Sequence, residues 1–124
     1  MIVAGIGCKI GIEAEAVRRL VQKVCELGLG KPFLLAVPEF RRDEAGIAQA
    51  AEALGLPIVW LEREGLRAVQ GRCLTHSARA EREVGLASVA EAAALAAAGP
   101  GGRLILPRIA AAGVTCALAQ GPLH

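Results

Sequence analysis

Cys8 and Lys9 are the first residues of this chain whose side chains could do chemistry. They lie in the stretch VAGIGCKIG, where Gly5, Gly7 and Gly11 surround them just ahead of a helix-like segment. A glycine-rich turn between a strand and a helix exposes backbone N–H groups, and a helix start favours negative charge. The stretch therefore suggests two roles, an anion-binding turn and a thiolate nucleophile at Cys8 whose charge the helix start and Lys9 would stabilise.

The nucleophile is the less favoured of these two hypotheses. No histidine is near Cys8 in the sequence, and the chain contains only His76 and His124. A nucleophilic thiol needs a positioned base, and an unactivated cysteine more often fills a turn or the core. We expect a structural Cys8 and an exposed His76, and we leave Lys9 open between anion binding and a solvated surface charge.

A nucleotide cofactor is not expected at the glycine turn. The dinucleotide fingerprint is G-x-G-x-x-G with an acidic residue about 20 positions later. Here the pattern is G-x-G-x-x-x-G, and Glu39 follows Gly7 by 32 residues. No G-K-[ST] ending follows the glycines, so a phosphate loop of the ATPase kind is also not expected.

Composition excludes several classes of partner. The 124 residues suit one domain, expected over 1–124, and a net charge of +2 with no dense basic run does not favour nucleic acid. No apolar run approaches the roughly 18 residues that span a bilayer, and no secretion signal is evident, so we expect a cytoplasmic protein without membrane contact. The widely spaced cysteines predict free thiols and no metal site; they are Cys8, Cys25, Cys73 and Cys116.

The first half of the chain alternates strand-like and helix-like segments. Apolar runs at 2–6, 33–37 and 58–61 predict three strands, with helices at about 13–27 and from about 44 between them. Right-handed β-α-β crossovers would make the three strands parallel.

The second half is less regular. We expect a short helix at 62–69, a loop at 70–78 and an alanine-rich helix at 88–98. Ser88 and Glu91 have the spacing of a capping box, in which each side chain bonds the backbone N–H of the other residue.

Two more strands are predicted at 103–107 and 114–119, joined as a hairpin by the six-residue loop RIAAAG. The expected fold class is α/β, a three-layer α/β/α domain with a mixed, mainly parallel sheet of about five strands. Phe33 and Trp60 stand in strand patterns and are expected in the core.

Four motifs in order resemble the CobE family, which is equivalent to the C-terminal domain of CbiG. They are GIGCKIG, RRDEAGI, GLASVAEAAAL and LPRIAAAGVTCALA. The resemblance covers nearly the whole chain and implies a role in cobalamin biosynthesis, in the steps that methylate and contract the tetrapyrrole ring. CbiG opens a lactone on a cobalt-precorrin and releases a two-carbon fragment. This chain begins directly at the C-terminal-domain motif and resembles the stand-alone CobE form.

The loops at the carboxyl ends of the parallel strands are expected to place Lys9, Arg41 and Arg42 at one edge of the sheet. The resemblance also implies a ligand-binding set, partly on these loops. A precorrin is a flat apolar ring with many carboxylates, so its binder needs cations and N–H donors around an apolar face. Asp43 and Glu44 have an alternative role as cap and dipole partner of the second helix. The implied residues are Gly7, Cys8, Lys9, Gly11, Arg42, Asp43, Glu44 and Arg108.

Two departures from the family pattern matter. Arg42 and Arg108 stand where the family often has lysine, which keeps the positive charge, and Ile12 replaces a hydroxyl residue that could cap a helix.

Two functions are carried forward from the sequence. The favoured one is a carrier or accessory protein that binds a precorrin or corrinoid intermediate, because no nucleophile, base and orienting group are recognisable together. The alternative is an enzyme acting on ring substituents, such as a CbiG-like hydrolase or deacylase. A third reading is an interaction subunit of a pathway methyltransferase. The expected partners are the intermediate and other cobalamin-pathway enzymes.

Overall fold

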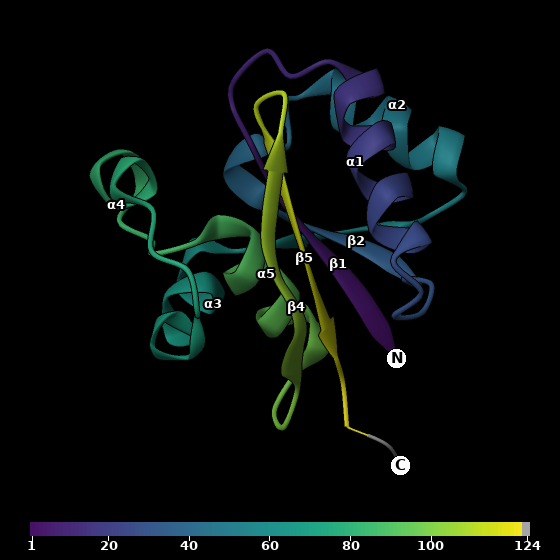
Figure 1. The fold of residues 1–124 in the computed structure, drawn as a ribbon. Helices are drawn as coiled ribbons and strands as arrows, with labels where there is room; N and C mark the ends of the chain where they lie inside the picture. Colours follow the sequence, from purple (N-terminus) through teal and green to yellow (C-terminus); the bar gives the residue numbers. More distant parts are fainter. Residues whose placement is uncertain (123–124) are drawn as a thin grey trace.

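A computed structural model describes residues 1–122, which fold into a five-stranded sheet with five α-helices around it (Figure 1). The strands are β1 (Ile2–Cys8), β2 (Leu34–Pro38), β3 (Ile58–Leu61), β4 (Arg103–Ala111) and β5 (Val114–Gln120). The helices are α1 (Ala14–Glu26), α2 (Ala45–Leu54), α3 (Arg63–Ala68), α4 (Ala78–Val84) and α5 (Val89–Ala98), with 3₁₀ turns at Glu39–Arg41 and Gln70–Arg72. Among these residues no helix is long and apolar enough to cross a bilayer.

The strand order across the sheet is β3-β2-β1-β5-β4. β1, β2 and β3 are parallel, whereas β5 runs antiparallel to both β1 and β4. The predicted α/β fold with a mixed sheet is therefore confirmed, and the parallel strands form one end of the sheet. The carboxyl ends of β1, β2 and β3 meet at one edge, where the loops after them come together.

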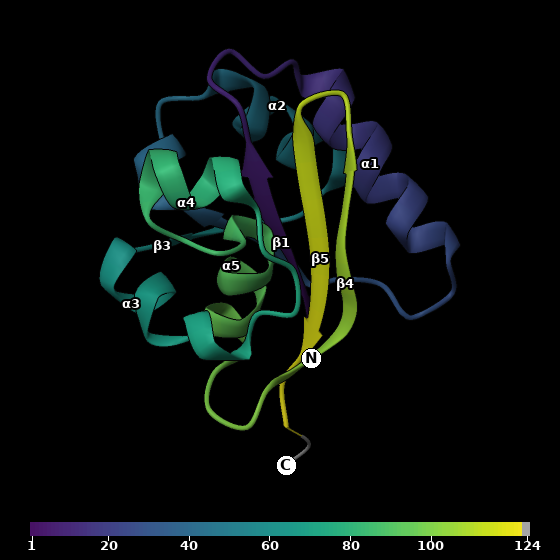
Figure 2. The same ribbon diagram turned by 60° about the vertical axis from the view of Figure 1, so that its left-hand side comes forward.

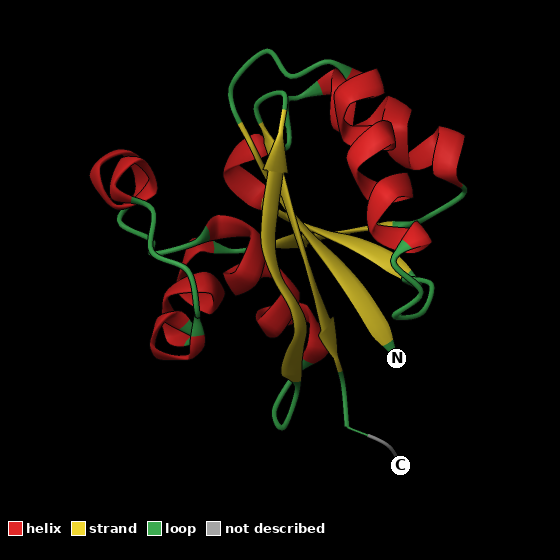
Figure 3. Ribbon diagram, viewed as in Figure 1, coloured by secondary structure: helices red, strands yellow, loops and turns green. Residues whose placement is uncertain are grey.

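Helices cover both faces of the sheet, as predicted (Figures 1 and 3). On one face, α1 and α2 bury an aliphatic stripe that includes Val17, Val21 and Val24 against Ala4 and Ile6 of β1. These α1 residues recur at helical spacing, which is why the sequence pattern located the helix correctly.

The other face is covered mainly by α5, which packs very close to β1. A Cβ atom on Gly5 would lie 2.0 Å from the carbonyl oxygen of Ala90 and 2.6 Å from the nitrogen of Ala94. Only glycine on the strand and small residues on the helix permit this approach. The alanine-rich composition of α5 therefore places its first turn, which contains Glu91, directly over the sheet.

The β4–β5 hairpin differs from the prediction. Residues 108–111, expected in a six-residue loop, continue β4, and only Ala112 and Gly113 form the turn. Both turn residues have positive φ, 52° and 83°, which is the pattern of a type I′ turn and matches the twist of the flanking strands. Arg108 therefore lies in a strand rather than in a loop.

The helix α4 occupies a stretch to which the sequence analysis assigned no element. It has no buried residue, so no apolar periodicity marks it. The hydroxyl of Ser77 accepts a hydrogen bond from the backbone N–H of Ala80 and caps its start. Just before α4, the predicted loop at 70–78 contains a 3₁₀ turn at Gln70–Arg72.

Phe33 was wrongly placed in the core. The residue is 64% exposed, because it precedes β2. Its backbone N–H extends the pairing of β2 with β1, donating to the carbonyl of Ile2 at 2.9 Å. Trp60, in β3, is half-buried and packs against the apolar cluster beneath α1 and α2.

Candidate functional site

A cleft of about 890 Å³ opens at the carboxyl ends of the parallel strands. Gly7 and Cys8, at the end of β1, and Thr115 of β5 line it in the middle. The tip of the β4–β5 hairpin lies on one side of this end of β1 and α4 on the other (Figure 2). Open α/β sheets bind their ligands at this edge, and we refer to this pocket below as the cleft.

The cleft is strongly basic. Among the described residues, five basic side chains line it and one acidic side chain, Glu83, accompanies them. Each basic residue comes from a different segment, so positive charge surrounds the opening and favours an anion with several charged groups. They are Lys9 after β1, Arg41 after β2, Arg63 at the start of α3, Arg79 in α4 and Arg108 in β4.

Two of these arginines lie against the aromatic ring of Phe40. The guanidinium carbons of Arg41 and Arg63 are 5.0 Å and 4.8 Å from the ring centroid. Arg41 Nε also donates to the carbonyl of Cys8 at 2.9 Å, and Arg63 Nη1 donates to the carbonyl of Val84 at 2.9 Å. Stacking and hydrogen bonding reduce the freedom of both side chains, so less entropy is lost when they bind a ligand.

Cys8 lies in the cleft as a thiol rather than a thiolate. Burial raises the pKa of the Cys8 thiol from 9.0 to about 11, and the nearby Arg41 guanidinium only partly opposes this. A nucleophilic cysteine needs a lowered pKa. The geometry thus agrees with the structural role expected for this residue.

The glycine turn holds an anion from its own chain. Glu44 Oε1 accepts hydrogen bonds from the backbone N–H groups of Gly11 at 2.8 Å and Ile12 at 3.2 Å. The carboxylate takes the position that a bound anion would take at the start of α1. Ile12 has no hydroxyl that could cap α1, and the N-cap residue Glu13 makes no side-chain cap hydrogen bond. The N–H of Ile12 instead donates to Glu44, from the next β-α unit.

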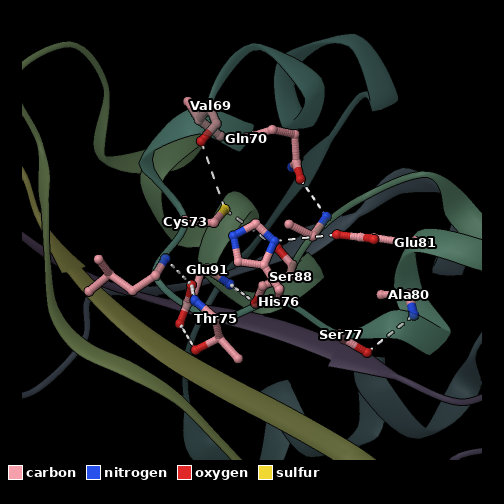
Figure 4. A network of polar contacts seen from close by, with 12 residues as sticks. Val69, Gln70, Cys73, Thr75, His76, Ser77, Ala80, Glu81, Ser88 and Glu91 are labelled. Atoms are coloured by element: carbon pink, nitrogen blue, oxygen red, sulfur yellow. Dashed lines mark hydrogen bonds and ion pairs between the residues drawn. The ribbon is translucent and has the colours of Figure 1, made fainter.

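Glu91 is a fully buried carboxylate beside the cleft (Figure 4). Its Oε1 accepts from the backbone N–H groups of Leu74 at 2.7 Å and Thr75 at 2.8 Å. Its Oε2 accepts from the Thr75 hydroxyl at 2.6 Å and from the backbone N–H of Arg108 at 2.9 Å. Burial acts to raise the pKa of Glu91, but these hydrogen bonds outweigh it and hold the pKa below its usual value of 4.5.

The predicted capping box is therefore half right. The Ser88 hydroxyl accepts from the backbone N–H of Glu91 at 3.4 Å, as expected for an N-cap. The Glu91 side chain, however, turns to the 74–75 segment and to Arg108 instead of returning to Ser88. A buried carboxylate with several N–H donors around it gains more from them than from one capping contact.

The eight predicted binding residues divide into two groups. Gly7, Cys8 and Lys9 line the cleft from the end of β1 and the loop after it, and Arg108 lines it from β4. The other four lie outside its lining: Gly11 and Glu44 bond each other, Asp43 is exposed, and the Arg42 guanidinium stacks on Trp60 at 5.4 Å and pairs with Glu39 at 3.6 Å.

Three of the five basic cleft residues, Arg41, Arg63 and Arg79, were absent from the predicted ligand-binding set. The loops at this sheet edge had placed Arg41 beside Lys9, and the same rule could have found Arg63, which follows the end of β3 by two residues. Arg79 carried no such signal, because α4 has no apolar face.

Comparisons with known proteins give a consistent result. A family model described as cobalamin synthesis G C-terminus matches residues 2–119. Protein CobE from Sinorhizobium sp is 33% identical over 124 residues, which covers 98% of this chain and 80% of that relative.

Two solved structures are also similar over nearly the whole chain. CobE, a protein from the cobalamin (vitamin B12) biosynthetic pathway, has a TM-score of 0.91 and 34% identity, covering 100% of this chain and 92% of that one. Cobalamin biosynthesis protein ChiG from Agrobacterium tumefaciens has a TM-score of 0.81 and 38% identity, covering 99% of this chain and 100% of that one.

Proposed function

Since this chain belongs to the cobalamin synthesis G C-terminus family and is a cobalamin biosynthesis protein, we propose that its cleft binds a precorrin or corrinoid intermediate of that pathway. The protein acts as a carrier or accessory that holds the intermediate between pathway enzymes. The observation that carries this proposal is the ring of five basic side chains around one cleft at the ligand-binding edge of the sheet.

The chemistry of such a ligand matches the cleft. Its peripheral carboxylates can pair with the arginines, whose planar guanidinium groups donate to both oxygens of a carboxylate at once. Its flat ring needs apolar surface, which Phe40, Val89 and the hairpin alanines supply. The rim is charged and the lining partly apolar, which suits a large amphipathic anion better than a small inorganic one.

Binding and release are favoured over covalent catalysis by the state of Cys8. With a pKa near 11, the thiol is protonated at neutral pH and does not offer a thiolate to the ligand. The basic residues around it are hydrogen-bond donors that can hold carboxylates.

The proposal is tested by titrating the protein with hydrogenobyrinate and following the absorption spectrum, with the methyl ester of the same ring as the uncharged comparison. We expect a saturable spectral shift with the acid, weakened by salt because exposed ion pairs are screened, and little binding of the ester. Mass spectrometry of the recovered pigment should show an unchanged mass. Loss of a fragment would replace the carrier with an enzyme acting on ring substituents, and no saturable shift would contradict binding altogether.

A further inference from the structure

Strand β4 is irregular where Arg108 lies. Leu106 pairs with Leu118 and Ile109 pairs with Cys116, so β4 has one more residue than β5 in this interval. Such a bulge bends its strand and leaves the extra residue out of the regular ladder. Pro107 has no backbone N–H, and the N–H of Arg108 donates to Glu91 Oε2 rather than to β5. The carboxylate therefore fixes the bulge from the α5 side.

The second oxygen of the same carboxylate holds the opposite side of the cleft. Oε1 receives the N–H groups of Leu74 and Thr75, which belong to the segment leading into α4. α4 itself has no buried residue, and its contacts with the rest of the protein include the packing of Val84 on an apolar cluster and the bond from Arg63 to the Val84 carbonyl. The Ser77 N–H donates to Ala87 and joins the segments on either side of α4. The position of α4 over the cleft therefore depends on both segments, and Glu91 anchors the one before it.

We infer that Glu91 is a positioning residue for the cleft, whose carboxylate links the bulge carrying Arg108 to the base of α4 and so sets the spacing of the two sides. This inference rests on the proposed function, because the spacing matters only for a ligand that contacts both sides. Glu91 does not line the cleft and touches no ligand there. It acts through Arg108 and through the residues of α4.

The carboxylate is the only side chain of this length that satisfies all of these donors. Each of its oxygens accepts from two hydrogen-bond donors. In Glu91→Gln one oxygen becomes an NH₂ group, which would face donors and leave at least one side unbonded. Ser88→Ala is a matched control, because it weakens the start of the same helix without touching either side of the cleft.

Amide hydrogen exchange tests the link without any ligand. In Glu91→Gln we expect exchange of the Leu74, Thr75 and Arg108 amides to rise at least about tenfold relative to the interior of α5. In Ser88→Ala these three amides should change only as much as the α5 amides do. If the three amides of Glu91→Gln stay as protected as in the wild type, Glu91 does not hold the two sides and the inference is wrong.

A double-mutant cycle with hydrogenobyrinate tests the effect on binding. We expect Glu91→Gln and Arg108→Ala each to weaken binding about tenfold. The double variant should be weaker than Arg108→Ala by clearly less than about tenfold, because only the part of the Glu91 effect that passes through α4 remains. Fully additive losses would contradict positioning through Arg108, as would equal losses in Glu91→Gln and Ser88→Ala. If the wild type does not bind this probe, the proposed function fails, and hydrogen exchange still decides whether Glu91 holds the two sides together.

Discussion

Glu44 Oε1 lies 2.8 Å from the backbone nitrogen of Gly11, although 33 positions separate the two residues in the chain. Glu44 immediately precedes α2, and Gly11 lies in the turn ahead of α1. One carboxylate thus joins the starts of two neighbouring helices, and its negative charge suits both of them. The glycine turn does bind an anion, but one that the protein supplies.

Removal of this carboxylate should lower stability. Glu44→Ala leaves the N–H groups of Gly11 and Ile12 without their acceptor, so we expect a loss of about 1 kcal/mol in the free energy of unfolding. Urea denaturation followed by circular dichroism measures the loss. Glu52→Ala, on the exposed side of α2, is the control and should change stability by less than about 0.5 kcal/mol. Equal effects of both substitutions would mean that the Glu44 contact contributes nothing.

Replacement of a basic residue that lines the cleft should weaken corrinoid binding. Hydrogen bonds to charged groups contribute about 1.5 to 3 kcal/mol, so Lys9→Ala and Arg63→Ala should each weaken hydrogenobyrinate binding by about ten- to a hundredfold. The loss should shrink as salt rises. Absorption titrations at low and high salt measure both effects, and circular dichroism checks the fold.

Two arginines outside the cleft sharpen this test. Arg19→Ala removes the same charge from the exposed surface of α1 and should leave binding within about twofold. Arg42→Ala separates the motif-based prediction, in which Arg42 contacts the ligand, from the cleft geometry, in which it stacks on Trp60. A loss of binding in Arg42→Ala as large as that in Lys9→Ala would extend the site beyond the cleft described above.

Cys8 should react slowly with alkylating reagents at neutral pH. Because burial raises its pKa to about 11, the thiolate is scarce at pH 7, and alkylation should accelerate only as the pH approaches that value. Iodoacetamide labelling read out by peptide mass spectrometry measures the profile. Cys8→Ser should bind hydrogenobyrinate within a few-fold of the wild type. Rapid labelling at pH 7, or a thousandfold loss in the folded variant, would restore the nucleophile hypothesis.

The pH dependence of stability should contain a contribution from Glu91. Its pKa in the folded protein lies below the usual 4.5, so ionised Glu91 stabilises the fold above that pH, and this stabilisation is lost as the pH falls through the folded pKa. Wild type and Glu91→Gln should therefore differ most in free energy of unfolding above pH 4.5 and converge in more acidic solution. Glu52→Gln should keep the acid sensitivity of the wild type. If the wild type stays more stable than Glu91→Gln by the same free energy of unfolding in acid, the negative charge of Glu91 does not stabilise the fold.

The turn of the β4–β5 hairpin offers a stabilising substitution. Ala112 has φ of 52°, a conformation that costs alanine more than glycine, so Ala112→Gly should raise the free energy of unfolding by about 0.5 to 1 kcal/mol. The neighbouring Ala111→Gly makes the same chemical change within β4 and should lower it. Thermal unfolding of both variants decides between them, and a destabilised Ala112→Gly would mean that the turn is not strained.

Elements with an apolar face could be predicted from the sequence, and elements without one could not. α1 was found because Val17, Val21 and Val24 recur at helical spacing, and they are buried as that pattern requires. α4 has no buried residue and depends on polar contacts and on its Ser77 cap, so nothing in its composition marked it. The apolar run predicted a strand that begins at Phe33, one residue before β2 begins. The exposure of Phe33 shows that an aromatic ring just before a strand need not face the core.

The site was predictable where it follows from topology. Lys9 reaches the cleft because loops after parallel strands meet at one edge of the sheet. Arg108 reaches it from β4. The partners of the acidic residues were not predictable, because long-range geometry decides them: Glu44 bonds Gly11 across two β-α units, and Glu91 bonds Arg108 rather than Ser88. The local spacing was compatible with a role for each carboxylate at the start of its own helix. In the structure, each carboxylate instead accepts hydrogen bonds from backbone N–H groups that are distant in the sequence.

The irregular course of β4 also bears on how this protein behaves at high concentration. β4 is an edge strand, and its outer side would be open to a strand from another molecule. Two register shifts and Pro107 interrupt the regular row of N–H and C=O groups that such pairing requires. The opposite edge, β3, is only four residues long. The bulge that directs the Arg108 N–H to Glu91 thus also protects the sheet against edge-to-edge aggregation.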